Sequence, residues 1–223
     1  MSIIEKAGKA IASKTAAILN LDQDHREVLE YGALNFLQTL FTVILIVLFG
    51  ILAGSLPEIL VLSLTAALLR QFSGGVHATS PYRCAVLSVL IFGGLSLLVK
   101  YDMVFSSRMP ALLFQGGALV FILVFLYRYA PADSPNKRIK NPDTRYRLKK
   151  SSFFFVMAAE LLTAILWEVH LKADSEMALQ FLVCIQLGML WQALSITPVM
   201  RRVIGWMDSL LIKFNPWKGG VRA

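Results

Sequence analysis

The sequence is poor in charged residues and in cysteine. Only 16% of its 223 residues are charged, whereas 57% are hydrophobic, and the mean hydropathy is +0.64. This composition argues against a soluble domain and predicts a membrane protein with several spans. The chain has two cysteines that lie far apart in the sequence, which argues against a disulfide framework.

The sequence also lacks the motifs of two common classes of enzyme. Its three histidines are scattered and no His-Glu-x-x-His motif occurs, which argues against a zinc metalloprotease. No glycine-rich loop ends in Gly-Lys-Ser or Gly-Lys-Thr, so we expect neither a nucleotide site nor another cofactor. The net charge of +8 does not indicate nucleic-acid binding, because basic residues in membrane proteins mark the cytoplasmic side.

The chain instead contains a series of apolar runs of about the 20 residues that a membrane-spanning helix needs. We therefore predict an all-α membrane protein: a helical segment over 1–30, a transmembrane domain over 31–200 and a basic tail over 201–223. The six predicted spans are Ala33–Leu52, a second span of about 14 residues that ends at about Arg70, Ala85–Val99, Ala111–Tyr127, Ser152–Val169 and Met177–Val199.

The distribution of basic residues predicts the side of the membrane on which each loop lies. Only three of the 22 lysines and arginines fall in predicted outer loops, namely Lys100, Arg108 and Lys172. The others lie in segments on the same side as both chain ends. Because basic residues collect in the cytoplasm, we expect both ends to be cytoplasmic.

The segments outside the spans are amphipathic or basic. Residues 2–21 have an apolar face flanked by lysines, which is typical of a helix on an anionic leaflet or packed on the protein's own cytoplasmic face. A second short helix is expected to end at Glu30, and residues 205–214 are expected to lie along the interface. Residues 128–150 are rich in turn formers and predict a polar, basic cytoplasmic loop.

The stretch 70–84, between the second and third spans, carries the clearest chemical signal. It contains His77 and Cys84, seven residues apart in a turn-rich segment that could fold them together. A thiol needs a base to become a nucleophile, and histidine is the usual base. Gly74 and Gly75 permit backbone conformations that other residues resist.

The residues before Cys84 predict the start of a helix. Ser80-Pro81 combines an N-cap residue with proline at the first helical position, so that Cys84 lies in or just after the first turn. There the helix dipole and the neighbouring Arg83 favour a thiolate. The preceding span, ending at Arg70, has about 14 residues and reaches roughly 21 Å, less than a hydrocarbon core of about 30 Å. We therefore expect the stretch 70–84 to begin below the membrane surface, in a protein-lined recess open to the cytosol.

With these residues placed, the chain resembles the AgrB (accessory gene regulator B) family of bacterial quorum sensing. Length, six spans and an amphipathic N-terminal segment agree as well, so the resemblance covers nearly the whole chain. The residues that carry it are Arg70, Gly74, Gly75, His77, Cys84 and the run Pro131-Ala-Asp133-Ser-Pro135-Asn136-Lys137.

The resemblance implies a cysteine endopeptidase embedded in the bacterial cytoplasmic membrane and acting as a homodimer. Such proteins cut a short AgrD-like propeptide on its C-terminal side and pass the acyl group to a Cys or Ser of the same peptide. The product is a thiolactone or lactone ring, the precursor of an autoinducing peptide. Anionic membrane lipid is a further expected partner.

In this mechanism Cys84 is the nucleophile, and His77 takes its proton and then protonates the leaving amine. Arg70 has two alternative roles: it orients a substrate carboxylate or stabilises charge, or it anchors the end of the second span at the interface. Gly74 and Gly75 are expected to shape the backbone, and an N–H group there could serve as an oxyanion donor.

The residue that orients His77 is not evident from the sequence. Asp133 is one candidate, because it follows a span that ends on the same side, and Ser73, Gln71 and Thr79 are local alternatives. Asp133 could instead cap a turn.

Glu160 is an ionisable residue inside the fifth span, which by default marks a functional position. It could pair with Arg70, face the recess, contact a dimer partner, or be a neutral, hydrogen-bonded residue used for helix packing. Gln186 and Gln192 in the sixth span pose the same question, and packing is the favoured interpretation for both.

The basic segment Lys137–Lys150 could bind the acidic part of a propeptide, but topology and contact with anionic lipid are favoured. The main alternative function is a small transporter or peptide exporter without proteolysis. That function predicts internal repeats with matching broken helices, and no convincing repeat is present. A non-catalytic membrane partner of a signalling peptide would not need Cys84 near a histidine.

Overall fold

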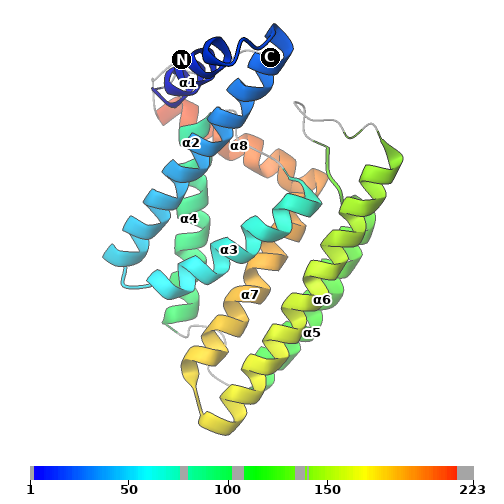
Figure 1. Cartoon of the computed structure of the whole chain (residues 1–223). Coiled ribbons are helices and arrows are strands. Elements are labelled where there is room, and N and C mark those ends of the chain that lie inside the picture. The colour runs from blue at the N-terminus through cyan, green and yellow to red at the C-terminus, as the bar shows by residue number, and fades with distance from the viewer. Residues whose placement is uncertain (1–2, 76–79, 102–107, 134–138, 140, 215–223) are drawn as a thin grey trace.

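The structure is a computed structural model, and it describes residues 3–75, 80–101, 108–133, 139 and 141–214. The described part consists of helices joined by short connections, with one isolated β-bridge (Figure 1). The helices are α1 (Ile3–Ile18), α2 (Gln23–Leu52), α3 (Leu56–Ser73), α4 (Pro81–Lys100), α5 (Arg108–Tyr129), α6 (Pro142–Ala173), α7 (Glu176–Ser195) and α8 (Pro198–Phe214).

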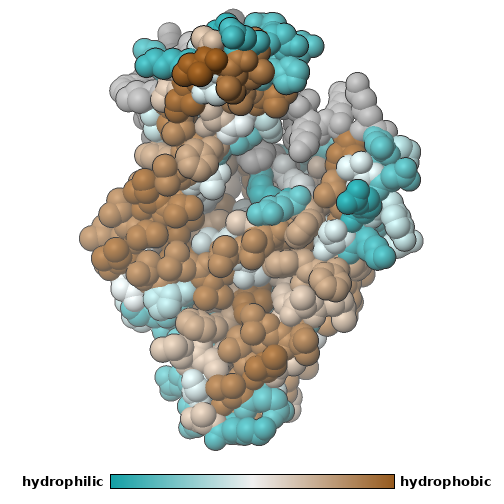
Figure 2. Space-filling view, in the orientation of Figure 1, coloured by the Kyte–Doolittle hydropathy of each residue, from teal (hydrophilic) through white to brown (hydrophobic). Residues whose placement is uncertain are grey.

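Six of these helices, α2 to α7, are long and apolar enough to cross a membrane. Figure 2 shows hydrophobic residues over the middle of the visible face and hydrophilic residues gathered at its two ends. This is the surface of a protein surrounded by lipid, since lipid replaces water around the apolar belt. The prediction of an all-α, multi-pass membrane protein with six spans is confirmed.

Helix α7 lies at the centre of the bundle and packs against α3, α4, α5 and α6. Its contact with α3 is close because Gly188 has no side chain: a Cβ there would lie 2.6 Å from the Leu62 carbonyl oxygen. The two buried apolar clusters both include α7. One includes Leu69, Ile122, Leu126, Val156 and Met189, and the other consists of Leu62, Val99, Leu182, Val183 and Cys184.

Two helices run further than the sequence predicts. The short helix expected to end at Glu30 continues into the first span as a single 30-residue helix, α2, because nothing at Tyr31 or Gly32 interrupts it. Helix α3 has 18 residues and ends at Ser73, so at 1.5 Å per residue it reaches about 27 Å. The prediction of a 14-residue second span was therefore wrong. Figure 1 shows α3 inclined across α7.

The basic loop is shorter than the predicted 128–150, because α6 begins at Pro142. The Asn141 side chain accepts a hydrogen bond of 2.8 Å from the Asp143 N–H, and proline occupies the first turn. This is an N-cap followed by proline, the pattern that also starts α4. Nearer the C-terminus, α7 ends at Ser195 and not at the predicted Val199. Helix α8 follows and includes part of the predicted tail.

The amphipathic helix α1 packs on the protein and also leaves apolar residues exposed. Ala12 and Ala16 are buried as α1 contacts α2, whereas Ile11 and Ile18 remain exposed. The burial of Ala12 and Ala16 agrees with the hypothesis that this helix packs on the protein, and contact with an anionic leaflet stays a prediction. Figure 1 shows α1 and α8 toward the same end of the bundle.

Candidate functional site

Cys84 lies where the sequence predicts it, just after the first turn of α4. Ser80 is the N-cap residue in extended conformation, Pro81 follows, and the Cys84 N–H donates to the Ser80 carbonyl oxygen at 3.0 Å. The thiol is half-buried and is a free cysteine. His77 and Thr79 lie outside the described residues, so their predicted roles stay predictions.

The end of α3 is joined to the segment that follows α5. The Ala132 N–H donates to the Ser73 carbonyl oxygen at 2.9 Å, and Gly74 forms a parallel β-bridge with Ala132. Gly74 has a φ of 71°, and a Cβ there would lie 2.3 Å from the Ala132 carbonyl oxygen. Both facts require glycine, since an L-residue resists this conformation and its side chain would collide with backbone. The contact brings together the two segments that carry the resemblance to AgrB.

Polar groups from α3 and α7 surround Gly75. Its φ is 152°, and a Cβ there would lie 3.3 Å from Arg70 Cζ and 3.4 Å from both Gln192 Nε2 and Ser195 Oγ. The buried Gln192 side chain donates to Ser73 Oγ at 2.8 Å and to the Gly74 carbonyl oxygen at 2.6 Å. We call this group the turn cluster: Arg70, Ser73, Gly74, Gly75, Gln192 and Ser195.

Gln192 is the residue of this site that sequence reasoning missed. The sequence assigns it, together with Gln186, to helix packing. A buried amide near the end of a span was the only available signal, and the spacing of residues along α7 does not reveal which backbone it meets. Its partners come from α3 and from the turn after it, more than 100 residues earlier in the chain.

The two arginines near Cys84 have different partners. Arg70, in the last turn of α3, lies beside Gly75, where a Cβ would be 3.3 Å from Arg70 Cζ. Arg83 Nε is 2.5 Å from Asp208 Oδ1 of α8, and this ion pair is largely buried, with exposed side-chain fractions of 15% and 5%. Arg83 therefore shares its charge with Asp208, and the expectation that it assists the thiolate stays a prediction.

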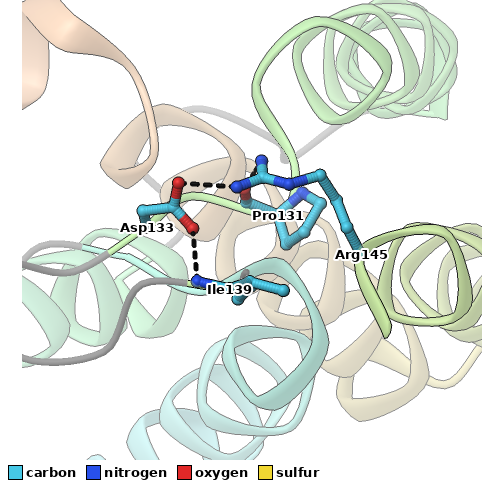
Figure 3. A network of polar contacts seen from close by, with 4 residues as sticks. All are labelled: Pro131, Asp133, Ile139 and Arg145. Atoms are coloured by element: carbon cyan, nitrogen blue, oxygen red, sulfur yellow. Dashed lines mark hydrogen bonds and ion pairs between the residues drawn. The ribbon is translucent and has the colours of Figure 1, made fainter. Parts of the chain in front are cut away.

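Asp133 follows α5 and contacts Ile139 and Arg145, the latter in α6 (Figure 3). Its carboxylate accepts from the Ile139 N–H at 3.2 Å and pairs with Arg145 Nη2 at 2.6 Å. Arg145 Nη1 also donates to the Pro131 carbonyl oxygen at 3.3 Å. These contacts match the turn-capping alternative, and a further role in orienting His77 stays a prediction.

Glu160 belongs to a second polar group, which we call the mid-span cluster: Gln115, Glu160, Thr163 and Gln186. Gln186 Nε2 donates to Glu160 Oε1 at 2.8 Å, and Thr163 Oγ1 lies 3.2 Å from Glu160 Oε2. Gln115 Nε2 donates to Thr163 Oγ1 at 2.9 Å. The cluster links α5, α6 and α7 by side chains alone, which fits the packing hypothesis for Glu160 and Gln186.

Within the described ranges, no three His, Cys, Asp or Glu side chains gather in a way that could hold a metal ion. Cys184, the other cysteine, is fully buried in α7 among apolar side chains. The chemistry that the described site offers is therefore that of a half-buried thiol beside an arginine and a glycine turn.

A model of the family described as AgrB, accessory gene regulator B, matches residues 6–196. The chain belongs to the AgrB family. This membership gives it a role in processing a quorum-sensing peptide, together with an AgrD-like propeptide.

Its relatives include proteins of Clostridium perfringens and Enterococcus faecalis. A protein of Clostridium perfringens strain SM101, described as AgrB-like, is 29% identical over 215 residues, covering 95% of this chain and 99% of the relative. Protein FsrB of Enterococcus faecalis is 23% identical over 202 residues, covering 89% of this chain and 76% of FsrB. No solved structure matches the chain.

Proposed function

We propose that this AgrB protein is a cysteine endopeptidase and peptide cyclase that uses Cys84 as its nucleophile and His77 as its base. The observation that carries the proposal is the position of Cys84. It is a half-buried free thiol just after the first turn of α4, with Ser80 as N-cap and Pro81 at the first helical position. The unpaired N–H groups at the start of a helix favour an anion, and the thiolate is the reactive form of cysteine.

The chemistry proceeds through a thioester. Cys84 Sγ attacks the scissile carbonyl carbon of an AgrD-like propeptide as its proton passes to His77. The C–N bond then breaks, and His77 returns the proton to the leaving amine of the C-terminal fragment. A Cys or Ser of the bound N-terminal fragment next attacks the thioester carbonyl, and Cys84 leaves as the thiolate and regains a proton. The products are a thiolactone or lactone and the free enzyme.

Water exclusion decides between this ring and a linear acid. Exchange of a thioester for a thiolactone is nearly balanced in free energy, whereas hydrolysis of the thioester is strongly downhill. The site must therefore keep water away until the peptide's own nucleophile arrives. Gly75 and Gln192 of the turn cluster are buried, so this side of the proposed site is shielded from water.

The placement of the site follows from the charge distribution. We propose that both chain ends, the turn cluster and Cys84 are on the cytoplasmic side of a bacterial cell membrane, where a thiol stays reduced. The amphipathic helices α1 and α8 lie toward one end of the bundle (Figure 1) and would rest on anionic lipid. A homodimer is part of the proposal and rests on family resemblance alone.

The direct test uses purified protein in liposomes with candidate AgrD-like propeptides, followed by mass spectrometry. The wild type is compared with Cys84→Ala, His77→Ala and the matched control Cys184→Ala, whose thiol is buried in apolar surroundings. We expect cleavage and a covalent peptide adduct in the wild type and in Cys184→Ala only. A released product lighter by one water than the linear fragment demonstrates cyclisation.

Processing by Cys84→Ala or His77→Ala at the wild-type rate would contradict the mechanism. The alternative, a peptide exporter without proteolysis, predicts that intact propeptide crosses the liposome membrane in all four proteins. The same liposomes measure this by protection of the peptide from added protease.

A further inference from the structure

The first turn of α4 is held from two sides. Tyr82 lies edge-to-face on Phe41 of α2, with the ring centroids 5.3 Å apart. Arg83 Nε pairs with Asp208 Oδ1 of α8 at 2.5 Å, and both side chains of this pair are largely buried. Cys84 is the next residue along the helix, so these two contacts fix where its backbone lies.

Thr197 joins the end of α7 to the start of α8, and it is buried between the two helices. Its hydroxyl donates to the Leu194 carbonyl oxygen at 2.8 Å and accepts from the Met200 N–H at 3.1 Å. One side chain therefore satisfies backbone groups at the end of α7 and at the start of α8. This double contact fixes the direction in which α8 leaves α7.

The inner face of α8 carries Asp208 to α4. Ile204 and Asp208 are four residues apart, so they lie on the same side of the helix, and both are buried, whereas Trp206 is exposed. At 1.5 Å per residue, α8 rises about 16 Å from Thr197 to Asp208. Figure 1 shows α8 leading from the end of α7 toward the end of the bundle where α4 begins.

The α7 end of this connection lies at the turn cluster. Ser195, the last residue of α7, belongs to that cluster, and its Oγ is 3.4 Å from the place of a Cβ at Gly75. Thr197 follows two residues later, and α8 begins at once. Helix α8 therefore connects the turn cluster to the first turn of α4, two parts of the proposed site that lie on different helices.

We propose that Asp208 is a positioning residue, which sets the place of Cys84 relative to the turn cluster through Arg83 and α8. This inference rests on the proposed function, since it assumes that Cys84 is the nucleophile. A hydrogen bond between two charged groups is short and directional, so it holds Arg83 in one geometry. A displacement of about 1 Å in a reacting group can cost on the order of a hundredfold in rate.

The test measures kcat and KM for propeptide processing in the liposome assay, per folded protein. The first variant is Asp208→Asn, which keeps the shape of the side chain and removes its charge. The matched control is Asp174→Asn, the same substitution in a pair with Arg108 at the other end of the bundle. The Asp174 side chain is 90% exposed, so its pair is a weak one.

A second pair of variants tests the helix between the two contacts. A Cβ at Gly205 meets no atom within 4 Å, so a larger residue fits there. Gly205→Pro interrupts α8 and leaves Thr197 and Asp208 unchanged, because proline removes an N–H donor and collides with the preceding turn. Gly205→Ala is the control, because alanine favours the helix.

We expect Asp208→Asn and Gly205→Pro to lower kcat at least about tenfold and to change KM less than about threefold. The reason is that the site still binds the propeptide but holds the nucleophile in the wrong place. Asp174→Asn and Gly205→Ala should stay within about twofold of wild type. If Arg83 acts only through its charge on the thiol, Asp208→Asn leaves that charge unbalanced and kcat holds or rises, which overturns the inference.

A rise in KM alone also overturns the inference, because the effect is then on propeptide binding, and an equal fall in Asp174→Asn overturns it as general loosening. If Asp208→Asn does not accumulate as folded protein, the two Gly205 variants decide, and equal kcat values in them overturn the inference. Wild-type processing by Cys84→Ala contradicts the proposed function itself, and the positioning role with it. A wild-type kcat in Asp208→Asn, with Cys84 still required, contradicts the positioning role alone.

Discussion

Among the described residues, two polar clusters of the interior each contain a buried glutamine of α7. In the turn cluster, Gln192 binds a backbone carbonyl and a serine at the end of α3. In the mid-span cluster, Gln186 binds only a side chain, the Glu160 carboxylate. The two residues are of the same type, on one helix, and both below 2% exposure.

The difference between the clusters lies in what each amide holds. A hydrogen bond between two side chains contributes to helix packing, and neighbouring side chains can change rotamer when that bond is lost. A hydrogen bond from a side chain to backbone at a turn fixes the path of the chain, and a change of rotamer nearby does not restore that path. We therefore expect changes in the turn cluster to alter the chemistry, and changes in the mid-span cluster to alter stability.

The largest effect is expected for Gly74→Ala, which acts on the turn cluster. The new Cβ would lie 2.3 Å from the Ala132 carbonyl oxygen, at a residue with a φ of 71°. We expect propeptide processing to fall by about a hundredfold or more, because the turn must move by an ångström or so. The assay is the liposome processing reaction, scored per folded protein.

The control for this change is Gly116→Ala in α5, where a Cβ meets no atom within 4 Å. Alanine is the better helix former there by about 1 kcal/mol, so processing and stability should hold or improve. If Gly74→Ala processes the propeptide at the wild-type rate, as Gly116→Ala should, then the turn at Gly74 does not require glycine and the prediction is wrong.

The next largest effect is expected for Asp208→Asn, which removes the ion-pair partner of Arg83. Loss of one member of a buried ion pair costs about 3–5 kcal/mol, because the remaining charge stays in a poorly solvated place. Thermal unfolding in detergent measures the loss. We expect the double variant Arg83→Met, Asp208→Leu to recover most of it, since apolar replacements of a buried pair are often neutral or better. A double variant less stable than Asp208→Asn would show that the pair itself stabilises the contact between α4 and α8.

A smaller effect is expected for Glu160→Ala in the mid-span cluster. The change leaves Gln186 and Thr163 without a carboxylate partner, which should cost about 1–3 kcal/mol of unfolding free energy. Processing per folded molecule should stay near wild type, as the contrast between the clusters requires. Glu168→Ala is the control, because that carboxylate is 60% exposed and pairs only with Lys172 among the bonds described here.

A hundredfold loss of processing in Glu160→Ala, with folding intact, would place the carboxylate in the chemistry. It would then revive the alternative in which Glu160 faces the recess.

The smallest effect is expected outside both clusters, at the N-cap of α2. The His25 N–H and ring donate to the Asp22 carboxylate, which lowers the pKa of Asp22 below its ordinary value. A lowered pKa means that the stabilisation is present above the unfolded-state pKa of about 3.9 and is lost as the pH falls through the folded-state pKa.

We therefore expect the amide hydrogen-exchange rate of the first turn of α2, measured relative to that of α7 at the same pH, to rise as the pH is lowered below about 4. Asp22→Asn should cap the helix without this pH dependence, because an amide does not titrate in that range. Identical pH dependence in Asp22→Asn would assign the effect to another group.

The sequence predicted much of the architecture because spans and helix starts are local signals. Apolar runs of sufficient length identified six spans, and Ser80-Pro81 placed the start of α4 and hence Cys84. The same N-cap and proline pattern at Asn141-Pro142 was present in the sequence but was overlooked among the turn residues of the predicted 128–150 loop. Errors of this kind could have been avoided without a structure.

Other errors could not have been avoided. The partner of Arg83 is Asp208, 125 residues later, and the partner of Gln192 lies 118 residues earlier. No periodicity in one helix indicates which turn of another helix it will meet. The same holds for Ala132, whose backbone lies against Gly74 and explains why that residue has no side chain.

The amino-acid sequence by itself determined that this AgrB protein is a bundle of six apolar helices with a thiol at the start of one of them. Length, hydropathy and capping act within a single helix, and the hydrophobic effect and backbone hydrogen bonding enforce them locally. Only the tertiary structure decided which polar groups meet inside that bundle. A buried hydrogen bond needs two partners within about 3 Å, and their distance in space is set by how the helices pack.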